Sequence, residues 1–257
     1  MEKIQIVKNQ DCISGMREIQ SESVDIIIAD PPYNIGKDFG NSSDKQNFDK
    51  YLIWCDEWIN ECIRIIKPNG LIYIYGFSET LAYLRVRIPI NVRWIVWHYQ
   101  NPRIVPHLSF FQRSHESILC CYKEKPRFDR DIIRQPYNRK LKNSVNRSAT
   151  SGLGKKRTIY TQHPQGKLPL DVLQIAGGCR KGKEKVNPPS QKPLKLCEQL
   201  IKPCLTDTPQ DILLVVPFAG SGSECVCAKQ HKINFIGFEV NPEYVALCND
   251  RLKDFPH

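Results

Sequence analysis

The stretch that decides the fold is residues 26–36, IIIADPPYNIG. Its uninterrupted apolar run is typical of a strand that is buried on both faces. The run ends abruptly in an acid, Asp30, followed by two prolines and Tyr33. Ligands in open α/β sheets bind at the carboxyl ends of such strands, so we interpret this corner as a candidate binding site. The purely structural alternative is a helix-capping Asp before a proline turn.

On both sides of this stretch, apolar strings alternate with helical patterns. Residues 1–10 are strand-like. The pattern predicts further strands at 71–77, 93–99, 116–123, 211–218 and 234–240, and helices at 48–70 (stopped by KPNG), 191–205, 219–231 and 241–255. Strands that alternate with helices indicate an α/β fold with a doubly wound, mostly parallel sheet.

The charge of the chain is concentrated in one segment. Between Lys123 and Lys192 there are 18 Lys and Arg against 5 Asp and Glu, an excess larger than the net +10 of all 257 residues. A basic segment on a near-neutral body indicates a polyanionic partner, with a solvated surface insert as the alternative.

Composition excludes several other classes of protein. With 41% hydrophobic and 25% charged residues the chain can bury a core, and no apolar run reaches the roughly 20 residues of a membrane helix. No signal peptide is recognisable, so we expect a cytoplasmic protein. The 11 cysteines include no C-x-x-C pair, so we expect reduced, structural cysteines and no metal site.

A second candidate site lies near the C-terminal end of the chain. The predicted strand at 211–218 leads through Gly220 and Gly222 into a helix, and the next strand ends in the acid Glu239. Glycines allow a tight turn and close approach of a ligand, and the acid can accept hydrogen bonds from ribose hydroxyls. Cys225 stands where the dinucleotide fingerprint GxGxxG needs its third glycine. We therefore expect a ligand that contains adenosine but no phosphate.

The corner at Asp30 suits an amino group on a flat base. An ionised carboxylate only accepts hydrogen bonds, and prolines fix the backbone and leave their carbonyls free as acceptors. The ring of Tyr33 offers a stacking face for a nucleobase. Together these groups could grip the exocyclic amine of a base.

These residues resemble a known family. DPPYN at 30–34 and FAGSG at 218–222 resemble motifs IV and I of the amino-group DNA methyltransferases, and their order is similar to that of the β class. The resemblance implies a circularly permuted, seven-stranded class I S-adenosylmethionine-dependent methyltransferase fold. It divides the chain into a catalytic half (1–122), a basic target-recognition insert (123–187) and a cofactor-binding half (188–257), which form one catalytic domain.

The resemblance also implies the reaction. A restriction-modification type enzyme would transfer methyl from S-adenosylmethionine to the N6 amine of an adenine flipped out of duplex DNA. Cytosine-N4 members of the family usually have Ser where Asp30 stands, which favours adenine. Cytosine N4 is the alternative, followed by methylation of RNA or of protein glutamine, and by an inactive DNA-binding module.

By position, the resemblance assigns site residues. The catalytic set is Asp30, Pro31, Pro32 and Tyr33. The cofactor set is Asp11, Cys12, Asp30, Ser190, Lys192, Phe218, Ala219, Gly220, Ser221, Gly222, Ser223, Glu239 and Val240. Asp11 would bind the adenine amine of the cofactor, and Ser190 and Lys192 its methionine carboxylate. The usual histidine of that last stretch is replaced by Pro188. The strand at 113–123 is interpreted as structural.

The expected partner is double-stranded DNA, bound by the basic insert with strong salt dependence. The DNA-binding candidates are Arg134, Asn138, Arg139, Lys140, Lys142, Arg147, Lys155, Lys156 and Arg157, with Gln135, Asn143 and Asn146 as further base readers. Residues 36–49 are interpreted as a lid or as a static surface loop. A cognate restriction endonuclease and a homodimer are left open.

Overall fold

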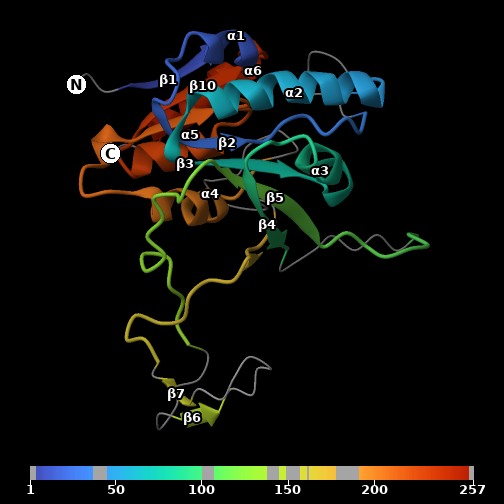
Figure 1. Cartoon of the computed structure of the whole chain (residues 1–257). Coiled ribbons are helices and arrows are strands. Elements are labelled where there is room, and N and C mark those ends of the chain that lie inside the picture. Colours follow the sequence, from blue (N-terminus) through green and yellow to red (C-terminus); the bar gives the residue numbers. More distant parts are fainter. Residues whose placement is uncertain are drawn as a thin grey trace.

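The computed structural model describes residues 4–36, 45–99, 107–137, 145–148, 157–160, 162–177 and 191–254. In this part of the chain one sheet of eight strands has the order β1-β10-β9-β2-β3-β5-β4-β8, and β6 and β7 form a separate two-stranded sheet. The expected doubly wound, mostly parallel architecture is confirmed (Figure 1).

The strands are β1 (Gln5–Asn9), β2 (Val24–Ala29), β3 (Ile66–Gly76), β4 (Asn91–His98), β5 (His115–Tyr122), β6 (Val145–Ser148), β7 (Arg157–Tyr160), β8 (Val172–Gln174), β9 (Leu213–Val216) and β10 (Asn234–Glu239). The helices are α1 (Cys12–Arg17), α2 (Phe48–Ile65), α3 (Ser78–Arg85), α4 (Leu194–Ile201), α5 (Ser223–Gln230) and α6 (Pro242–Asp254), with short 3-10 helices at Lys202–Cys204 and Pro209–Asp211.

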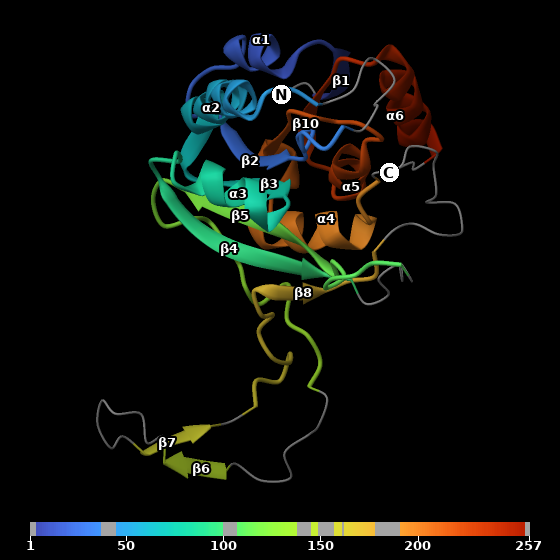
Figure 2. The same ribbon diagram turned by 90° about the vertical axis from the view of Figure 1, so that its right-hand side faces the viewer.

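Helices cover both faces of the large sheet. Helices α1, α2 and α3 pack on one face, and α4, α5 and α6 pack on the other (Figure 2). In β2, Ile26 and Ile28 belong to the core under the second group, whereas Ile27 and Ala29 belong to the core under the first. This double burial explains why β2 is an apolar run without alternation.

The two ends of the chain build one sheet. Strand β2 pairs in parallel with β9, with Ile26 opposite Leu214 and Ile27 opposite Val215, and β1 pairs in parallel with β10. Strand β5 pairs antiparallel with both β3 and β4, so it alone runs against the others in this sheet. The seven strands expected from the resemblance are joined by β8, which extends the edge beyond β4.

The KPNG segment lies inside a strand. Helix α2 begins after its N-cap Asn47 and ends at Ile65, before the expected stop, and β3 begins at the next residue. Residues 67–70 form a bulge in β3, because Val24 pairs with Ile66 whereas Ile26 pairs with Leu71. Two helices, α1 and α3, were not predicted separately. Helix α1 has only six residues, whereas α3 has eight, as many as α4 and α5, so length does not explain why α3 was missed.

The basic insert leaves the body as two segments that lie side by side. Gln135 and Lys167 exchange backbone hydrogen bonds of 2.9 and 2.8 Å, and the amide of Asp129 donates to Pro203 O at 2.7 Å. Strands β6 and β7 lie away from the large sheet in both views (Figures 1 and 2). Of the predicted lid, residues 37–44 lie outside the described part. The segments on either side of them are joined by the side chain of Asn34, which donates to the carbonyl of Gln46 and accepts from its amide.

The ten cysteines in the described ranges are free and buried. Within the same ranges, no helix combines the length and the apolar character needed to cross a bilayer. A search of those residues also finds no group of three or more His, Cys, Asp or Glu that could hold a metal ion.

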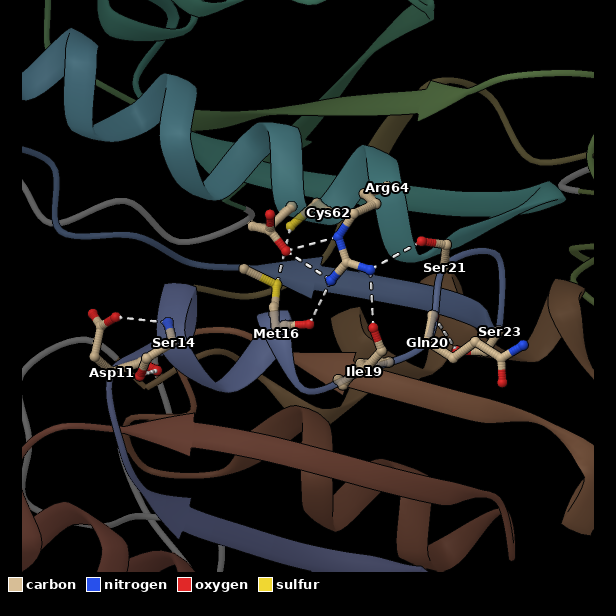
Figure 3. A network of polar contacts seen from close by, with 10 residues as sticks. Asp11, Ser14, Met16, Ile19, Gln20, Ser21, Ser23, Cys62 and Arg64 are labelled. Atoms are coloured by element: carbon tan, nitrogen blue, oxygen red, sulfur yellow. Dashed lines mark hydrogen bonds and ion pairs between the residues drawn. The ribbon is translucent and has the colours of Figure 1, made fainter.

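Arg64 fastens α1 to α2 (Figure 3). Its guanidinium donates to the carbonyls of Met16 at 2.7 Å and Ile19 at 3.0 Å and to the hydroxyl of Ser21 at 3.0 Å, and Glu61 holds it at 2.7 Å. Met16 lies in the last turn of α1, and its carbonyl also accepts from the amide of Ile19 at 2.9 Å, so Arg64 adds a charged donor to a carbonyl that the helix end already uses. At the other end of α1, Asp11 caps the helix by accepting from two amides.

Arg64→Ala should therefore destabilise the protein. Loss of charge-assisted hydrogen bonds to these carbonyls is expected to lower the free energy of unfolding by about 2 kcal/mol, measured by urea denaturation. Arg17→Ala, at an exposed position in the last turn of α1, is the control and should change it by less than about 0.5 kcal/mol. Equal losses in the two variants would contradict the role of Arg64.

Candidate active site

Four neighbouring parallel strands bring the predicted site residues to one edge of the sheet. Asp30 follows β2, the glycine turn follows β9, Glu239 ends β10 and Asp11 follows β1. The strand order β1-β10-β9-β2 makes these ends consecutive. Residues from the first and last thirds of the chain thus share one edge, as the sequence predicted.

The glycine turn leaves open space at this edge. Gly220 and Gly222 have φ values of +49° and +75°, a left-handed conformation that side chains rarely adopt. A Cβ at Gly222 would collide with Cys248 Sγ, so this glycine permits close packing of α5 on α6. A Cβ at Gly220 would meet nothing within 4 Å. Gly220 therefore borders a space that a ligand could enter.

Glu239 is held beside the glycine turn by backbone amides. Its Oε2 accepts from Gly220 N at 2.9 Å and its Oε1 accepts from Asn241 N at 2.8 Å. A carboxylate has further lone pairs, so it can still accept hydrogen bonds from a ligand. The neighbouring strand end carries Asp11 and Cys12. Burial, with Asp11 and Glu239 nearby, raises the pKa of the Cys12 thiol, so this cysteine stays neutral.

The other residues of the predicted cofactor set divide into three groups. Phe218 packs against Trp54 and Trp58, with ring centroids 5.7 and 5.4 Å apart, and Ala219 is buried. Ser221 and Ser223 are buried, and Arg251 donates to the carbonyl of the former and the hydroxyl of the latter. Val240 is exposed, and Ser190 lies outside the described residues.

Asp30 is the centre of a polar network. Its Oδ1 accepts from the Tyr33 hydroxyl at 2.7 Å, and its Oδ2 accepts from Lys192 Nζ at 2.6 Å. The Tyr33 hydroxyl also lies 3.2 Å from Glu116 Oε2, and the Tyr99 hydroxyl donates to Glu116 Oε1 at 2.6 Å. One cation, two carboxylates and two phenols thus meet beside the proline corner.

Lys192 forms an ion pair with Asp30, whereas the resemblance implied that it binds the methionine carboxylate of the cofactor. Its side chain is 6% exposed, and Nζ is 3.6 Å from Glu116 as well. Burial alone would lower the pKa of Lys192, but Asp30 and Glu116 outweigh burial and raise it above its ordinary value. Lys192 therefore stays charged and compensates two carboxylates that would otherwise repel each other.

Sequence reasoning missed Glu116. It lies in β5, a strand interpreted as structural, at the second position after the loop that precedes this strand. Because β5 runs against its neighbours, its start lies at the edge where β2 and β3 end. In the sequence, Glu116 stands out only as an acid before the apolar residues of β5. The direction of this strand, which decides the edge of the sheet at which Glu116 lies, cannot be read from the sequence.

Glu224 is a second acid beneath the site. It is 4% exposed, and its carboxylate accepts a weak hydrogen bond from the Cys197 thiol at 3.6 Å. Burial, followed by the charge of Asp30, raises its pKa to about 7. Glu224 is thus partly protonated near neutral pH, which limits the negative charge around Lys192.

The proline corner is fixed from outside. The Tyr51 hydroxyl donates to the Pro32 carbonyl at 2.9 Å, so this carbonyl has a partner within the protein. Asn34 adopts a left-handed φ of +58°, which ends the corner. The Tyr33 ring lies edge-on to Phe77 at 4.9 Å. Burial, then Asp30 and Glu116, raise the pKa of Tyr33 well above its ordinary value, so its hydroxyl remains a donor.

Most DNA-binding candidates cannot be placed. Asn138, Arg139, Lys140, Lys142, Asn143, Lys155 and Lys156 lie outside the described residues, as do the side chains of Asn146, Arg147 and Arg157. The side chain of Arg134 is 10% exposed, and its guanidinium donates to Asp131 Oδ1 and to the Gly166 carbonyl, each at 2.7 Å. Arg134 therefore stabilises the base of the insert, next to the backbone pairing of Gln135.

One family model and several known proteins match most of this chain. A family model described as DNA methylase matches residues 24–250. The type II methyltransferase M.HpaI of Haemophilus parainfluenzae is 29% identical over 94% of this chain and 72% of that protein. The DNA adenine methyltransferase YhdJ of Escherichia coli (strain K12) is 30% identical over 96% of this chain and 82% of that protein.

Solved structures of similar fold have lower identity. The PvuII DNA methyltransferase (cytosine-N4-specific) matches with a TM-score of 0.71 at 16% identity and covers 95% of this chain and 85% of that one. The M1.HpyAVI–SAM complex matches with a TM-score of 0.57 at 22% identity, covering 96% and 98%. These likenesses concern the fold alone.

Lys192→Met tests the charge balance of the site. The variant leaves Asp30 and Glu116 without their shared cation, so we expect the free energy of unfolding to fall by about 3 kcal/mol at pH 8. Chemical denaturation measures the loss.

Lys195→Met is the matched control, because Lys195 is exposed and lies only three residues further along. It should leave the free energy of unfolding nearly unchanged. A Lys192→Met protein as stable as the parent would contradict charge compensation by Lys192.

Proposed function

The chain belongs to the N6/N4 DNA methylase family, and from this premise we propose that it methylates the N6 amine of an adenine in duplex DNA. The methyl donor is S-adenosylmethionine, and the enzyme is of the restriction-modification type. The observation that carries the proposal is the parallel pairing of β2 with β9, which makes the ends that carry Asp30 and Gly220 neighbours.

S-adenosylmethionine supplies an electrophilic methyl group on a positively charged sulfur. Two residues near the open space at Gly220 fit it. Glu239, which accepts from the amide of Gly220, would bind the ribose, and Asp11, after the neighbouring strand β1, would bind the adenine amine. Binding of the ribose and of the adenine amine does not require a phosphate site. This agrees with the glycine turn, in which Cys225 replaces the third glycine of the dinucleotide fingerprint GxGxxG. We assign Lys192 to Asp30 and not to the methionine carboxylate, because its ammonium is within 2.6 Å of that acid.

Asp30 and Tyr33 would act on the target base. The amine of a flipped adenine would donate to Asp30, which leaves the nitrogen lone pair free for the methyl group. As the nitrogen–carbon bond forms, the methyl–sulfur bond would break, the sulfur would leave as a neutral thioether, and the nitrogen would then lose one proton to solvent. The Tyr33 ring lies against the base, and the nearby negative charge stabilises the positive charge that develops on nitrogen. Attack is direct, so no cysteine nucleophile is required, in accord with the raised pKa values of the buried cysteines Cys12 and Cys197.

Glu116 is a positioning residue in this proposal. Asp30 and Glu116 share the Tyr33 hydroxyl and the Lys192 ammonium. When the base amine reaches Asp30, both donors can turn towards Glu116 without losing a charged partner. The network thus lets Asp30 exchange a protein donor for a substrate donor at little electrostatic cost.

Adenine is favoured over cytosine by two observations. The acid Asp30 stands where cytosine-N4 members usually carry Ser, and a relative of 30% identity is a DNA adenine methyltransferase. Cytosine N4 is the second candidate, because the PvuII enzyme of similar fold is specific for it. We further propose that residues 123–187 read the DNA sequence and that 1–122 and 188–257 form the catalytic domain around the shared sheet.

Sequencing of genomic DNA from a bacterial host that expresses the protein tests the proposal. Single-molecule detection of modified bases should find N6-methyladenine at one short recognition sequence. N4-methylcytosine would support the second candidate. No modified base, together with methyl transfer to RNA or protein in a radiolabel assay, would overturn the assignment to DNA.

Asp30→Ala should abolish catalysis without abolishing cofactor binding. Loss of the acceptor for the amine is expected to reduce methyl transfer to DNA by about 10³-fold or more. Calorimetry should detect S-adenosylmethionine binding within about threefold of the parent, because Gly220 and Glu239 are unchanged. The variant Glu57→Ala, at an exposed position of α2, controls for nonspecific effects of removing an acid. Retention of activity by the Asp30 variant would refute the mechanism.

A further inference from the structure

Two neighbouring phenylalanines project from the loop that precedes β5. Phe110 and Phe111 are 79% and 88% exposed, and their rings contact each other edge to face with centroids 5.1 Å apart. Leu108 in the same segment is 47% exposed. Single exposed apolar residues are normal, but adjacent exposed aromatics mark an interaction surface.

The loop lies at the edge of the sheet that carries the proposed active site. His98 ends β4 and pairs with His115, which begins β5, so the chain between them leaves the sheet where β2 and β3 end. Figure 1 shows the segment before β5 (green) extending beyond the body at this end of the sheet.

Side-chain contacts link the root of the loop to Tyr33. Arg113 lies 4.1 Å above the Phe77 ring and bonds Glu79 at 2.9 and 3.2 Å. The same Phe77 ring also lies edge-on to the ring of Tyr33. Phe111 is two residues from Arg113, or at most roughly 7 Å along an extended chain. The aromatic pair therefore projects from a fixed root beside the base-binding corner.

We propose that Phe110 and Phe111 form an aromatic wedge that enters duplex DNA at the target base pair and fills the gap left by the flipped base. The inference rests on the proposed function and deepens it. Removal of one base from the stack leaves its neighbours and its former partner without stacking contacts. Apolar side chains between base steps offset part of this cost, and an aromatic ring can stack on a base of any kind.

The experiment compares two DNA substrates with the double variant Phe110→Ala/Phe111→Ala. One duplex carries the recognition sequence found by sequencing. The other is identical except for an abasic position opposite the target base, where the target is already unpaired. The wedge predicts a 10- to 100-fold loss of kcat/KM on the matched duplex and less than a threefold loss on the abasic duplex.

Two further variants complete the design. Phe110→Trp/Phe111→Trp keeps the aromatic faces and should keep activity on both substrates. Val86→Ala removes a single exposed apolar side chain, 82% exposed at the end of α3, and should change neither rate. With 2-aminopurine as the target base, the fluorescence increase on binding should be lost in the alanine variant and kept in the tryptophan variant.

Three outcomes would overturn the wedge. Equal losses on the two substrates would indicate general DNA contact, and unchanged rates on both would indicate no role. A change in oligomeric state of the alanine variant, measured by light scattering, would identify the pair as an interface between copies of this chain. If the parent protein methylates neither duplex, the proposed function itself is wrong. Assays of the parent protein therefore separate failure of the proposed function from failure of the wedge.

Discussion

The parallel pairing of β2 with β9 is the constraint on which the rest of the structure depends. It joins segments separated by most of the chain, and the cores on both faces of the sheet are continuous across it. Because both strands point the same way, their ends present the acid corner and the glycine turn at one edge.

A buried cation organises that edge. Lys192 is almost completely enclosed and compensates Asp30 and Glu116, while Glu224 nearby has its pKa raised to about 7. Such a group of charges is costly to bury and is held only where its members are hydrogen-bonded. The phenols of Tyr33 and Tyr99 supply those bonds. These contacts form within the protein itself, and both oxygens of Asp30 have donors.

Aromatic contacts connect this centre to the surface. Tyr33 touches Phe77, Phe77 carries Arg113, and Arg113 is followed back along the chain by the exposed Phe111 and Phe110. On the opposite side of the corner, Tyr51 holds the Pro32 carbonyl and Asn34 ties the chain to Gln46. The corner at residues 30–34 is thus supported from α2 and α3.

The sequence by itself determined the fold class and the residue types of both motifs. An apolar run buried on both faces needs helices on both sides, and an acid, two prolines and a tyrosine after such a run have few structural uses. The sequence also predicted α2, α4, α5 and α6, but not α1 and α3. Only the tertiary structure decided the partners of Asp30. The antiparallel direction of β5 brings Glu116 to the edge, and the folding of α4 over the sheet brings Lys192 onto Asp30. Distances between residues so far apart in sequence depend on strand order and direction, and local patterns of side chains do not carry that information.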